Sequence, residues 1–418
     1  MKKSKTILLL GMILTALFSV NAAAEDEAEA TEAAADIAAS AKDAEAAAAE
    51  MAEGYTIGVS YYDPEDFEGI AFREYFDNYL GTAFNAEFYY NSESIDSAED
   101  EIAFVEELHE QGIQGIISFM STYVEDVLPV CEEYGMYYIC GSGTITEEVY
   151  DSVKDNPYFL GVVGPTDEDE EQAGEYLAEK LSALDEGQNA SYLVVSGGSS
   201  LGNEMHRLRT VGILTKLQEI YGLTYDQSAE ELAELSEETE ISTGTDVRIT
   251  ILPGYLTDGT AVGSAAATGE YDMVISCMTI ANAITYITDA EAENGYDIKV
   301  GMVDCFTDQN YAFFNEKDVN GDSKLNCLVG KYGAVVAPAF VAMSNAYAGY
   351  AEDFRDEGSA FWLHQTYWYA ADTEEFNEQY ALSIGISENT YSAADMMQVM
   401  KLFNNEADFD AYREFTEK

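Results

Sequence analysis

A serine framed by glycines is the first feature of this sequence that could do chemistry. Gly198-Ser199-Ser200-Leu201-Gly202 fits the G-x-S-x-G pattern of a hydrolase nucleophile elbow, with an apolar run before it and a helix-like run after it. A triad order can be written with Ser200, Asp304 and His364. The competing interpretation is a binding loop, in which glycines let backbone N–H groups and hydroxyls face a ligand.

Two weaker motifs concern metals and redox chemistry. The segment 318–326 imitates the start of a calcium loop, but Ser323 stands where the turn glycine belongs and Val329 where the bidentate acid belongs. We therefore favour a polar Asn-Gly turn over a metal site and expect no cofactor, while whether Asp318, Asn320 and Asp322 hold calcium is left open. The five cysteines are too few and too scattered for a disulfide framework, and whether Cys277 and Cys305 pair is left open.

The amino terminus predicts export. Three lysines precede an apolar run over 7–20 and small residues at 21–24, which is the pattern of a secretory signal peptide over residues 1–24. No second long apolar run follows, so we expect no membrane insertion. No cysteine lies near the cleavage site, so we expect no lipid anchor. The sequence thus favours a periplasmic or extracellular location.

Composition and charge limit the partners. Residues 25–54 are nearly all alanine and acid and are expected to be a tether, because they have no large side chains to bury. Nineteen Lys and Arg against 79 Asp and Glu give a formal net charge of −60, which repels nucleic acid and anionic lipid. We expect a solvated acidic surface on a protein that acts as a monomer.

From Tyr55 onward, short apolar runs alternate with amphipathic stretches. Amphipathic helices are predicted over 97–111 and 123–134 and a further helix after Pro165, then over 203–221 and around 280–290, with an acidic surface insert over 226–246. Strands alternating with helices of this length indicate parallel sheets. The strand-like runs are 55–61, 87–90, 115–119 and 136–140 in the first half, and 191–196, 247–252, 272–277 and 298–303 in the second.

These elements predict an α/β protein with two doubly wound (Rossmann-like) parallel-sheet lobes, joined by a multi-strand hinge, with a ligand cleft between them. The expected boundaries are 55–162 plus about 333–350 for the N-terminal lobe, and 163–332 plus about 351–418 for the C-terminal lobe. Ligands of this fold class bind at the carboxyl ends of the strands. The loops there supply most candidate ligand-binding residues: Tyr61, Tyr62, Asp63, Phe67, Phe119, Met120, Ser142, Thr144, Ser199, Ser200, Met278, Thr279 and Asp304.

The order of these features resembles the type 1 periplasmic substrate-binding proteins, the ribose and galactose class that serves ABC importers. The resemblance covers about residues 55–345 and depends on the export signal, on "VLPVCEEYGMYYIC" and on "HRLRTVGILTKL". The latter is similar to the family's R-x-x-G-aromatic helix, with Arg209 and Gly212 matching and Ile213 replacing the aromatic. The resemblance implies that Arg209 clamps the ligand, and it places Tyr332 near the cleft.

Several departures and alternatives accompany the resemblance. Gly141 falls where the family has a first-lobe carboxylate, and one additional residue separates Gly301 from Asp304. Compared with the family's pattern, this sequence retains more of the aromatic rings that could stack on an apolar ligand face than of the acidic side chains. A cleft-facing Arg209 is expected to support little packing, so that the fold should survive its removal.

The favoured interpretation is a non-enzymatic, exported solute-binding protein that captures a small polar ligand, a sugar or sugar derivative, and delivers it to an ABC permease. One alternative is the same fold binding a nucleoside or a signalling molecule for a sensor. A remote alternative is a secreted Ser200 hydrolase. The absence of an HGGG-like oxyanion segment before Leu193 and the division of the strands into two sheets argue against hydrolysis.

Overall fold

The chain divides into two compact units. The computed structural model describes residues 54–185, 190–254, 259–384 and 390–417. Of the described residues, unit 1 comprises 54–164, 334–365 and 390–417, and unit 2 comprises 165–185, 190–254, 259–333 and 366–384. The predicted signal peptide lies outside the described residues, as does the predicted tether except for Gly54. Both stay predictions.

Unit 1 is built on a six-stranded sheet in the order β12-β5-β4-β3-β1-β2, and every neighbouring pair is parallel. The four strands predicted from apolar runs are confirmed, since β3 and β4 are buried along nearly their whole length, as a covered parallel sheet requires. The strands are β1 Tyr55–Ser60, β2 Ala86–Tyr90, β3 Gly115–Ser118, β4 Tyr137–Gly141, β5 Phe159–Gly164 and β12 Phe361–His364.

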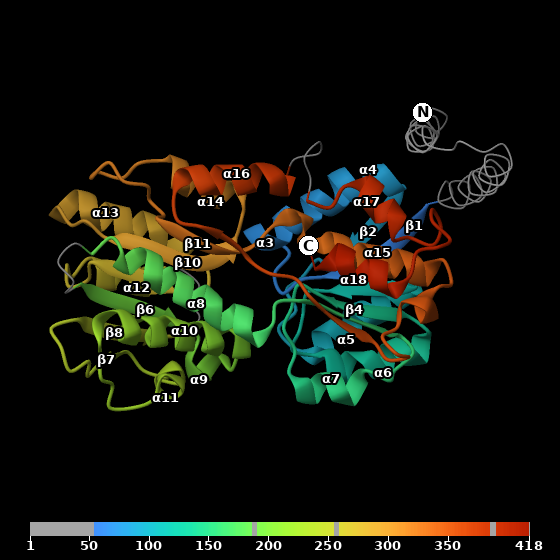
Figure 1. The fold of residues 1–418 in the computed structure, drawn as a ribbon, viewed down its shortest axis with the longest axis horizontal. Helices are drawn as coiled ribbons and strands as arrows, with labels where there is room; N and C mark the ends of the chain where they lie inside the picture. Colours follow the sequence, from blue (N-terminus) through green and yellow to red (C-terminus); the bar gives the residue numbers. More distant parts are fainter. Residues whose placement is uncertain (1–53, 186–189, 255–258, 385–389, 418) are drawn as a thin grey trace, which may run out of the picture. The chain divides into compact units, whose positions relative to one another are not determined.

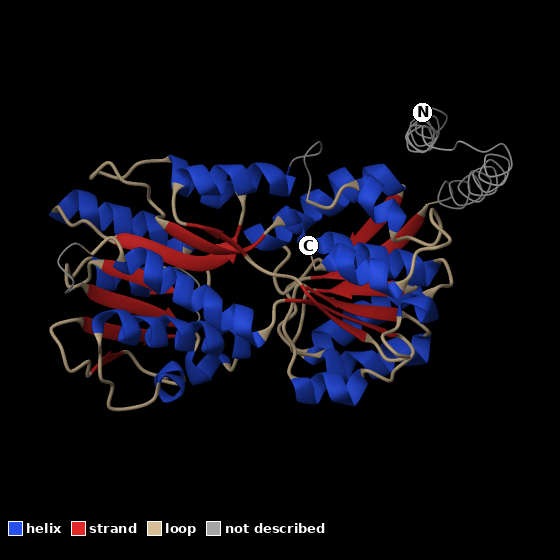
Figure 2. Cartoon of the chain, viewed as in Figure 1, coloured by secondary structure: helices blue, strands red, loops and turns tan. Residues whose placement is uncertain are grey.

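Helices cover both faces of this sheet (Figure 2). Helices α5 and α6 pack on one face, and α15 contacts β3, β4 and β5. Ser97 caps α5 by accepting the Asp100 N–H, and α6 ends at Gly135 with φ 66°, so the predicted helix bounds are confirmed. The helical segments are α3 Phe67–Glu74, η1 Tyr75–Leu80, α4 Gly81–Phe84, α5 Ala98–Glu110, α6 Val124–Tyr134, α7 Glu147–Val153, α15 Ala337–Tyr347, η4 Ala351–Phe354, α17 Ala393–Gln398 and α18 Phe409–Thr416.

Unit 2 is built on a seven-stranded sheet in the order β13-β11-β10-β9-β6-β8-β7. Its five central strands are parallel, and the two edge strands β13 and β7 run antiparallel to their neighbours. The strands are β6 Ser191–Ser196, β7 Thr239–Ile241, β8 Arg248–Pro253, β9 Met273–Ser276, β10 Lys299–Cys305, β11 Cys327–Lys331 and β13 Trp368–Ala370. The second predicted parallel sheet is thus confirmed.

The helices of unit 2 also lie on both faces of its sheet (Figures 1 and 2). Helices α8 and α10 pack closely because both carry a glycine at the contact: a Cβ on Gly174 or on Gly212 would lie 2.0 Å from a backbone oxygen of the other helix. The helical segments are α8 Asp167–Ser182, α9 Gly198–Leu201, α10 Glu204–Tyr221, α11 Ala229–Ala233, α12 Thr260–Ala266, η2 Ala281–Ala283, α13 Ile284–Asn294, α14 Asp308–Asn315 and α16 Thr373–Ile384, while η3 Gly333–Val336 begins at the unit boundary.

Two expectations differ from the structure. Residues 351–365 and 390–417 belong to unit 1, although the sequence places them in the second lobe. The reason is long-range pairing, since β12 joins β5 and the Tyr412 hydroxyl of α18 donates to the Pro338 carbonyl. The acidic insert 226–246 carries α11 and the edge strand β7, so it is partly built into unit 2. Among the described residues, no helix is both long and apolar enough to cross a bilayer.

Candidate functional site

The carboxyl edge of the unit 1 sheet brings the predicted aromatic residues together. Tyr61 follows β1 and Phe119 follows β3, and their rings stack with centroids 5.3 Å apart. Phe72 of α3 packs against Phe119 at 4.8 Å. Tyr61 is only 3% exposed, so its ring is part of the core beneath this edge. Its role in ligand contact stays a prediction.

Tyr62 and Phe67 present the aromatic surface of this edge. Tyr62 is 50% exposed and Phe67 is 44% exposed. Tyr62 lies in the loop after β1 and Phe67 is the first residue of α3. Local hydrogen bonds fix this segment, because Asp63 Oδ1 accepts the Glu65 N–H at 2.9 Å and Asp66 Oδ1 accepts the Phe67 N–H at 2.8 Å. Exposed rings on an ordered segment can stack on the apolar face of a sugar.

The other predicted residues of unit 1 are largely buried. The Met120 N–H donates to Ser118 Oγ at 3.0 Å, and Met120 is 6% exposed. Ser142 has φ 51°, is 3% exposed and donates its N–H to the Val163 carbonyl at 2.6 Å. Thr144 is half-buried in the same loop. Met120 and Ser142 therefore help to fix the loops at this edge through their backbone hydrogen bonds.

Sequence reasoning missed the buried carboxyl behind this edge. Glu101 of α5 is fully buried, and its Oε1 accepts hydrogen bonds from Ser118 Oγ at 2.6 Å, Ser60 Oγ at 3.1 Å and the Tyr138 hydroxyl at 3.4 Å. Burial raises the pKa of Glu101 to about 7, although these hydroxyl donors act in the opposite direction. The signal was helix periodicity, because Glu101 lies four residues before Val105 and therefore on the inward face.

At the carboxyl edge of unit 2, two predicted residues meet. The Thr279 hydroxyl, after β9, donates to Asp304 Oδ2 of β10 at 3.0 Å. Asn310 of α14, which the sequence did not single out, donates its Nδ2–H to the same oxygen at 2.8 Å and to the Cys305 carbonyl at 2.7 Å. The Asp304 carboxylate is half-buried and held in one orientation. An oriented carboxylate is a suitable acceptor for ligand hydroxyls.

Arg209 is part of a buried network. Its Nε donates to Glu170 Oε2 at 2.6 Å, its Nη1 to the Cys277 carbonyl at 3.1 Å and its Nη2 to the Tyr367 hydroxyl at 2.7 Å. Tyr367 in turn donates to Glu170 Oε1 at 2.8 Å. Arg209 is 6% exposed, so the expectation that it supports little packing is wrong. Its contact with a ligand stays a prediction.

The charges of this network stabilise one another. Burial by itself lowers the pKa of Arg209, but the adjacent Glu170 and Tyr367 outweigh it, so that the pKa is raised and the guanidinium stays charged. The guanidinium carbon also lies 5.5 Å from the centroid of the Tyr367 ring. Arg209 therefore joins α8, α10 and the end of β9.

The remaining predicted residues of unit 2 differ in exposure. Met278 is 5% exposed, and Tyr332 is 2% exposed with its ring stacked on Trp368 at 3.7 Å. Ser199 and Ser200 are exposed in the four-residue helix α9. Among the described residues, no histidine or carboxylate lies within hydrogen-bonding distance of the Ser200 hydroxyl, which does not support a nucleophile elbow.

Two polar atoms beside α9 are buried without a hydrogen-bond partner: Ser196 Oγ at the end of β6 and His206 Nδ1 in the first turn of α10. Burial lowers the pKa of His206 to about 3, and the neighbouring cations Arg209 and Lys331 act in the same direction. His206 is therefore neutral at physiological pH. Neither residue was among the sequence candidates.

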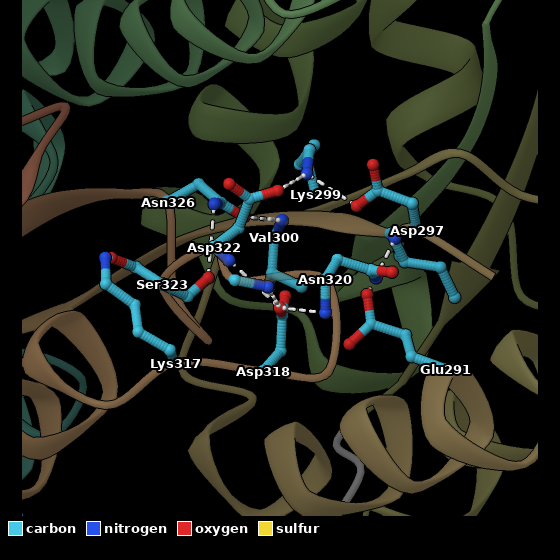
Figure 3. Close-up of polar contacts among 12 residues, drawn as sticks. Glu291, Asp297, Lys299, Val300, Lys317, Asp318, Asn320, Asp322, Ser323 and Asn326 are labelled. Carbon is cyan, nitrogen blue, oxygen red and sulfur yellow. Dashed lines mark hydrogen bonds and ion pairs between the residues drawn. The ribbon is translucent and has the colours of Figure 1, made fainter. Parts of the chain in front are cut away.

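The calcium-like segment 318–326 is a turn whose polar groups form hydrogen bonds within the segment and to neighbouring residues (Figure 3). Asp318 Oδ1 accepts the backbone N–H groups of Asn320, Gly321 and Asp322 at 2.8 to 3.0 Å, and Asp322 pairs with Lys299. Within the described ranges, no group of His, Cys, Asp and Glu side chains could hold a metal ion. The predicted Asn-Gly turn is confirmed. The five cysteines are buried and none of them is in a disulfide, so Cys277 and Cys305 do not form one with each other.

Comparison with known proteins identifies the fold. No protein-family model matches the chain, and no curated protein matches it. Solved structures do match: a solute-binding protein from Actinobacillus succinogenes with bound D-allose has a TM-score of 0.57 and 13% identity, over 78% of this chain and 99% of that one. The chain has the fold of a periplasmic solute-binding protein.

Two further structures extend this likeness. A galactofuranose-binding protein has a TM-score of 0.54 and 16% identity, over 79% of this chain and 98% of that one. A solute-binding protein from Bacillus halodurans with bound myo-inositol has a TM-score of 0.51 and 17% identity, over 78% and 97%. The two-lobed fold predicted from the sequence is thus confirmed. Because the sequence identities are low, these matches support the fold and no particular function.

Proposed function

We propose that the chain is an exported, monomeric solute-binding protein that captures a sugar or sugar derivative and delivers it to the permease of an ABC importer. The observation that carries the proposal is the Asp304 carboxylate, which Thr279 and Asn310 hold at the carboxyl edge of unit 2. A fixed carboxylate accepts hydrogen bonds from sugar hydroxyls without having to be reordered on binding.

The aromatic edge of unit 1 supports a carbohydrate ligand. Tyr62, in the loop after β1, and Phe67, at the start of α3, are exposed at the carboxyl ends of the strands, where ligands of this fold class bind. The matched structures with D-allose and myo-inositol contain polyhydroxylated rings, which combine hydroxyls with apolar faces. These ligands favour a sugar over a nucleoside or a signalling molecule. In this proposal, Arg209 supports the site indirectly, because its Nη1 donates to the Cys277 carbonyl directly after β9.

The proposed chemistry is binding, with no bond made or broken. Ser200 has no base beside it among the described residues, so Ser200→Ala should leave ligand affinity within a few-fold. The same variant would abolish turnover of an activated ester if the chain were a hydrolase. Release of product from such an ester by the parent protein would reject the binding-only proposal.

A calorimetric screen tests the function. D-allose, L-arabinose, D-galactose, myo-inositol and two nucleosides are titrated into the parent protein. We expect a sugar or polyol to bind and Asp304→Asn to weaken it at least about tenfold, since a charge-assisted acceptor is lost. Asp246→Asn is the matched control, because Asp246 is exposed just before β8, at the amino end of that strand. Binding of nucleosides alone would overturn the proposal.

A further inference from the structure

Glu101 occupies an unusual position for a carboxyl group. It projects from α5 into the interior of unit 1, where it is fully buried and bonded to residues of three parallel strands. Ser60 ends β1, Ser118 ends β3 and Tyr138 lies in β4. All three donate to a single oxygen, Oε1, whereas Oε2 has no hydrogen-bond partner in the described structure. The carboxyl therefore ties together the strands that carry the aromatic edge.

The same hydroxyls also reach the loop that follows β3. Ser118 Oγ accepts the Met120 N–H at 3.0 Å and lies 3.4 Å from the Met120 carbonyl oxygen. The Tyr138 hydroxyl lies 3.4 Å from that carbonyl oxygen as well. Each hydroxyl has one proton to donate, so donation to Glu101 competes with donation to Met120. The carboxyl and the loop thus share two donors.

The groups facing Glu101 include no cation among the interactions of the described chain. They are the Tyr138 phenol of β4, the Cys131 thiol of α6 and the Tyr123 phenol before α6. Burial raises the pKa of both Tyr138 and Cys131, so these groups stay neutral. Hydroxyl donors alone compensate an ionised Glu101, and its neutral form is accessible near pH 7.

We propose that Glu101 is a positioning residue for the Phe119–Met120 loop, and that its protonation changes how the loop is held. An ionised Glu101 draws the Ser118 and Tyr138 protons to Oε1. A protonated carboxyl is a weaker acceptor, so the two hydroxyls turn to the Met120 carbonyl and tighten the loop. The inference rests on the proposed function, because the loop belongs to the ligand-binding edge suggested there.

Methionine NMR tests the link between carboxyl and loop without any ligand. In protein labelled with ¹³C in the methionine methyl groups, we expect the Met120 signal to shift between pH 5 and pH 9 with a midpoint near neutrality. Glu101→Gln keeps an accepting oxygen but cannot ionise, so the shift should vanish. Glu291→Gln is the matched control: it removes another buried carboxyl, in unit 2, and should leave the Met120 titration unchanged.

A second variant protects the test against misfolding of Glu101→Gln. The Ser60 hydroxyl donates to Glu101 and makes no hydrogen bond to Met120 in the described structure, so Ser60→Ala should raise the midpoint of the Met120 titration while the shift persists. A Met120 signal that is independent of pH in the parent protein, or that still titrates in Glu101→Gln, overturns the proposal.

Ligand affinity separates this inference from the proposed function. For whichever of D-allose, L-arabinose and myo-inositol binds, we expect affinity to change at least about threefold between pH 5.5 and pH 8.5, and to be flat in Glu101→Gln. A binding profile that is equally flat in both proteins overturns the positioning role and leaves sugar capture intact. If no sugar binds, the proposed function fails, while the Met120 titration still decides whether Glu101 positions the loop.

Discussion

The two units each bury a glutamate behind the carboxyl edge of the sheet, and they compensate it in different ways. In unit 1, Glu101 is surrounded by hydroxyls and its pKa is raised to about 7. In unit 2, Glu170 is bonded to the guanidinium of Arg209 and to the Tyr367 hydroxyl. Glu101 can therefore change its charge near neutral pH, whereas Glu170 is paired with the guanidinium of Arg209, which stays charged.

This difference assigns different roles to the two carboxyls. The buried ion pair of Arg209 and Glu170 fixes the contact between α8, α10 and the end of β9, and removal of one partner is strongly destabilising. A carboxyl held by hydroxyls tolerates the loss of its charge, because its neutral form is cheaper to bury. We therefore expect unit 2 to be sensitive to substitution and unit 1 to be sensitive to pH.

The largest expected effect is on the buried ion pair. Arg209→Met removes the cation that is paired with the fully buried Glu170 carboxyl, which should lower the free energy of unfolding of unit 2 by about 3–5 kcal/mol. Urea denaturation measures the loss of unfolding free energy, and hydrogen exchange of the α8 and α10 amides shows whether the loss lies in unit 2. An unchanged midpoint would show that solvent reaches Glu170.

A double substitution sharpens this result. Arg209→Met combined with Glu170→Leu removes both charges and replaces them with apolar side chains. Because hydrophobic replacement of a buried pair is often neutral, the double variant should be more stable than Arg209→Met alone. If the double variant is the less stable of the two, the cost comes from lost packing instead of from the unpaired carboxylate.

The next largest effect is the pH response of unit 1. The folded-state pKa of Glu101 is raised from 4.5 to about 7, so its contribution to stability is fully present below about pH 4.5 and is lost as pH rises through about 7. Glu101→Gln cannot ionise and avoids this loss. We expect the variant to gain roughly 2–4 kcal/mol over the parent protein above pH 8 and nothing comparable at pH 5.

The control for this response lies on the same helix. Glu106 of α5 is exposed, so Glu106→Gln should change stability by less than about 0.5 kcal/mol at any pH. Thermal unfolding at pH 5, 7 and 9 compares the three proteins. A stability difference between Glu101→Gln and the parent protein that does not vary with pH would contradict the raised pKa.

Much of the fold could be predicted because local patterns encode it. Strands covered on both faces are continuous apolar runs, as in β3 and β4, and helix ends carry their own signals, such as Gly135 after α6. The assignment of residues 351–365 and 390–417 to unit 1 could not be predicted in this way. It depends on the pairing of β12 with β5, about 200 residues earlier in the chain.

The location of the candidate site could be predicted from the sequence, but the hydrogen-bond and ion-pair partners of its residues could not. Strand ends located Thr279 and Asp304, which do meet in the structure. By contrast, Glu170 stands in a run of acids over 167–171 in which nothing in the sequence distinguishes it from its neighbours. Its burial against Arg209, 39 residues away, follows from the close approach of α8 and α10 at Gly174 and Gly212. Long-range packing decides which acid becomes an ion-pair partner.

A smaller effect is expected from the hydroxyl that joins the two halves of the ion pair. Tyr367→Phe removes a donor to Glu170 and an acceptor for Arg209 while keeping the ring, so it should cost about 1–3 kcal/mol. Tyr369→Phe is the control, since the Tyr369 ring packs on Tyr176 and its hydroxyl has no hydrogen-bond partner among the described residues. Equal losses in the two variants would mean that the Tyr367 hydroxyl adds nothing to the pair.

The smallest effect is expected two residues before Arg209. Arg207 pairs with Glu204 one turn earlier on α10, and the two side chains are 27% and 44% exposed. Exposed pairs gain little because water and salt screen them, so Arg207→Ala should cost less than about 1 kcal/mol, and less still in 0.5 M salt. Arg209→Met should lose a similar amount at both salt concentrations, because its pair is buried. Urea titrations with and without salt therefore separate the two arginines, and a loss for Arg207→Ala as large as that for Arg209→Met would show that burial is not what distinguishes them.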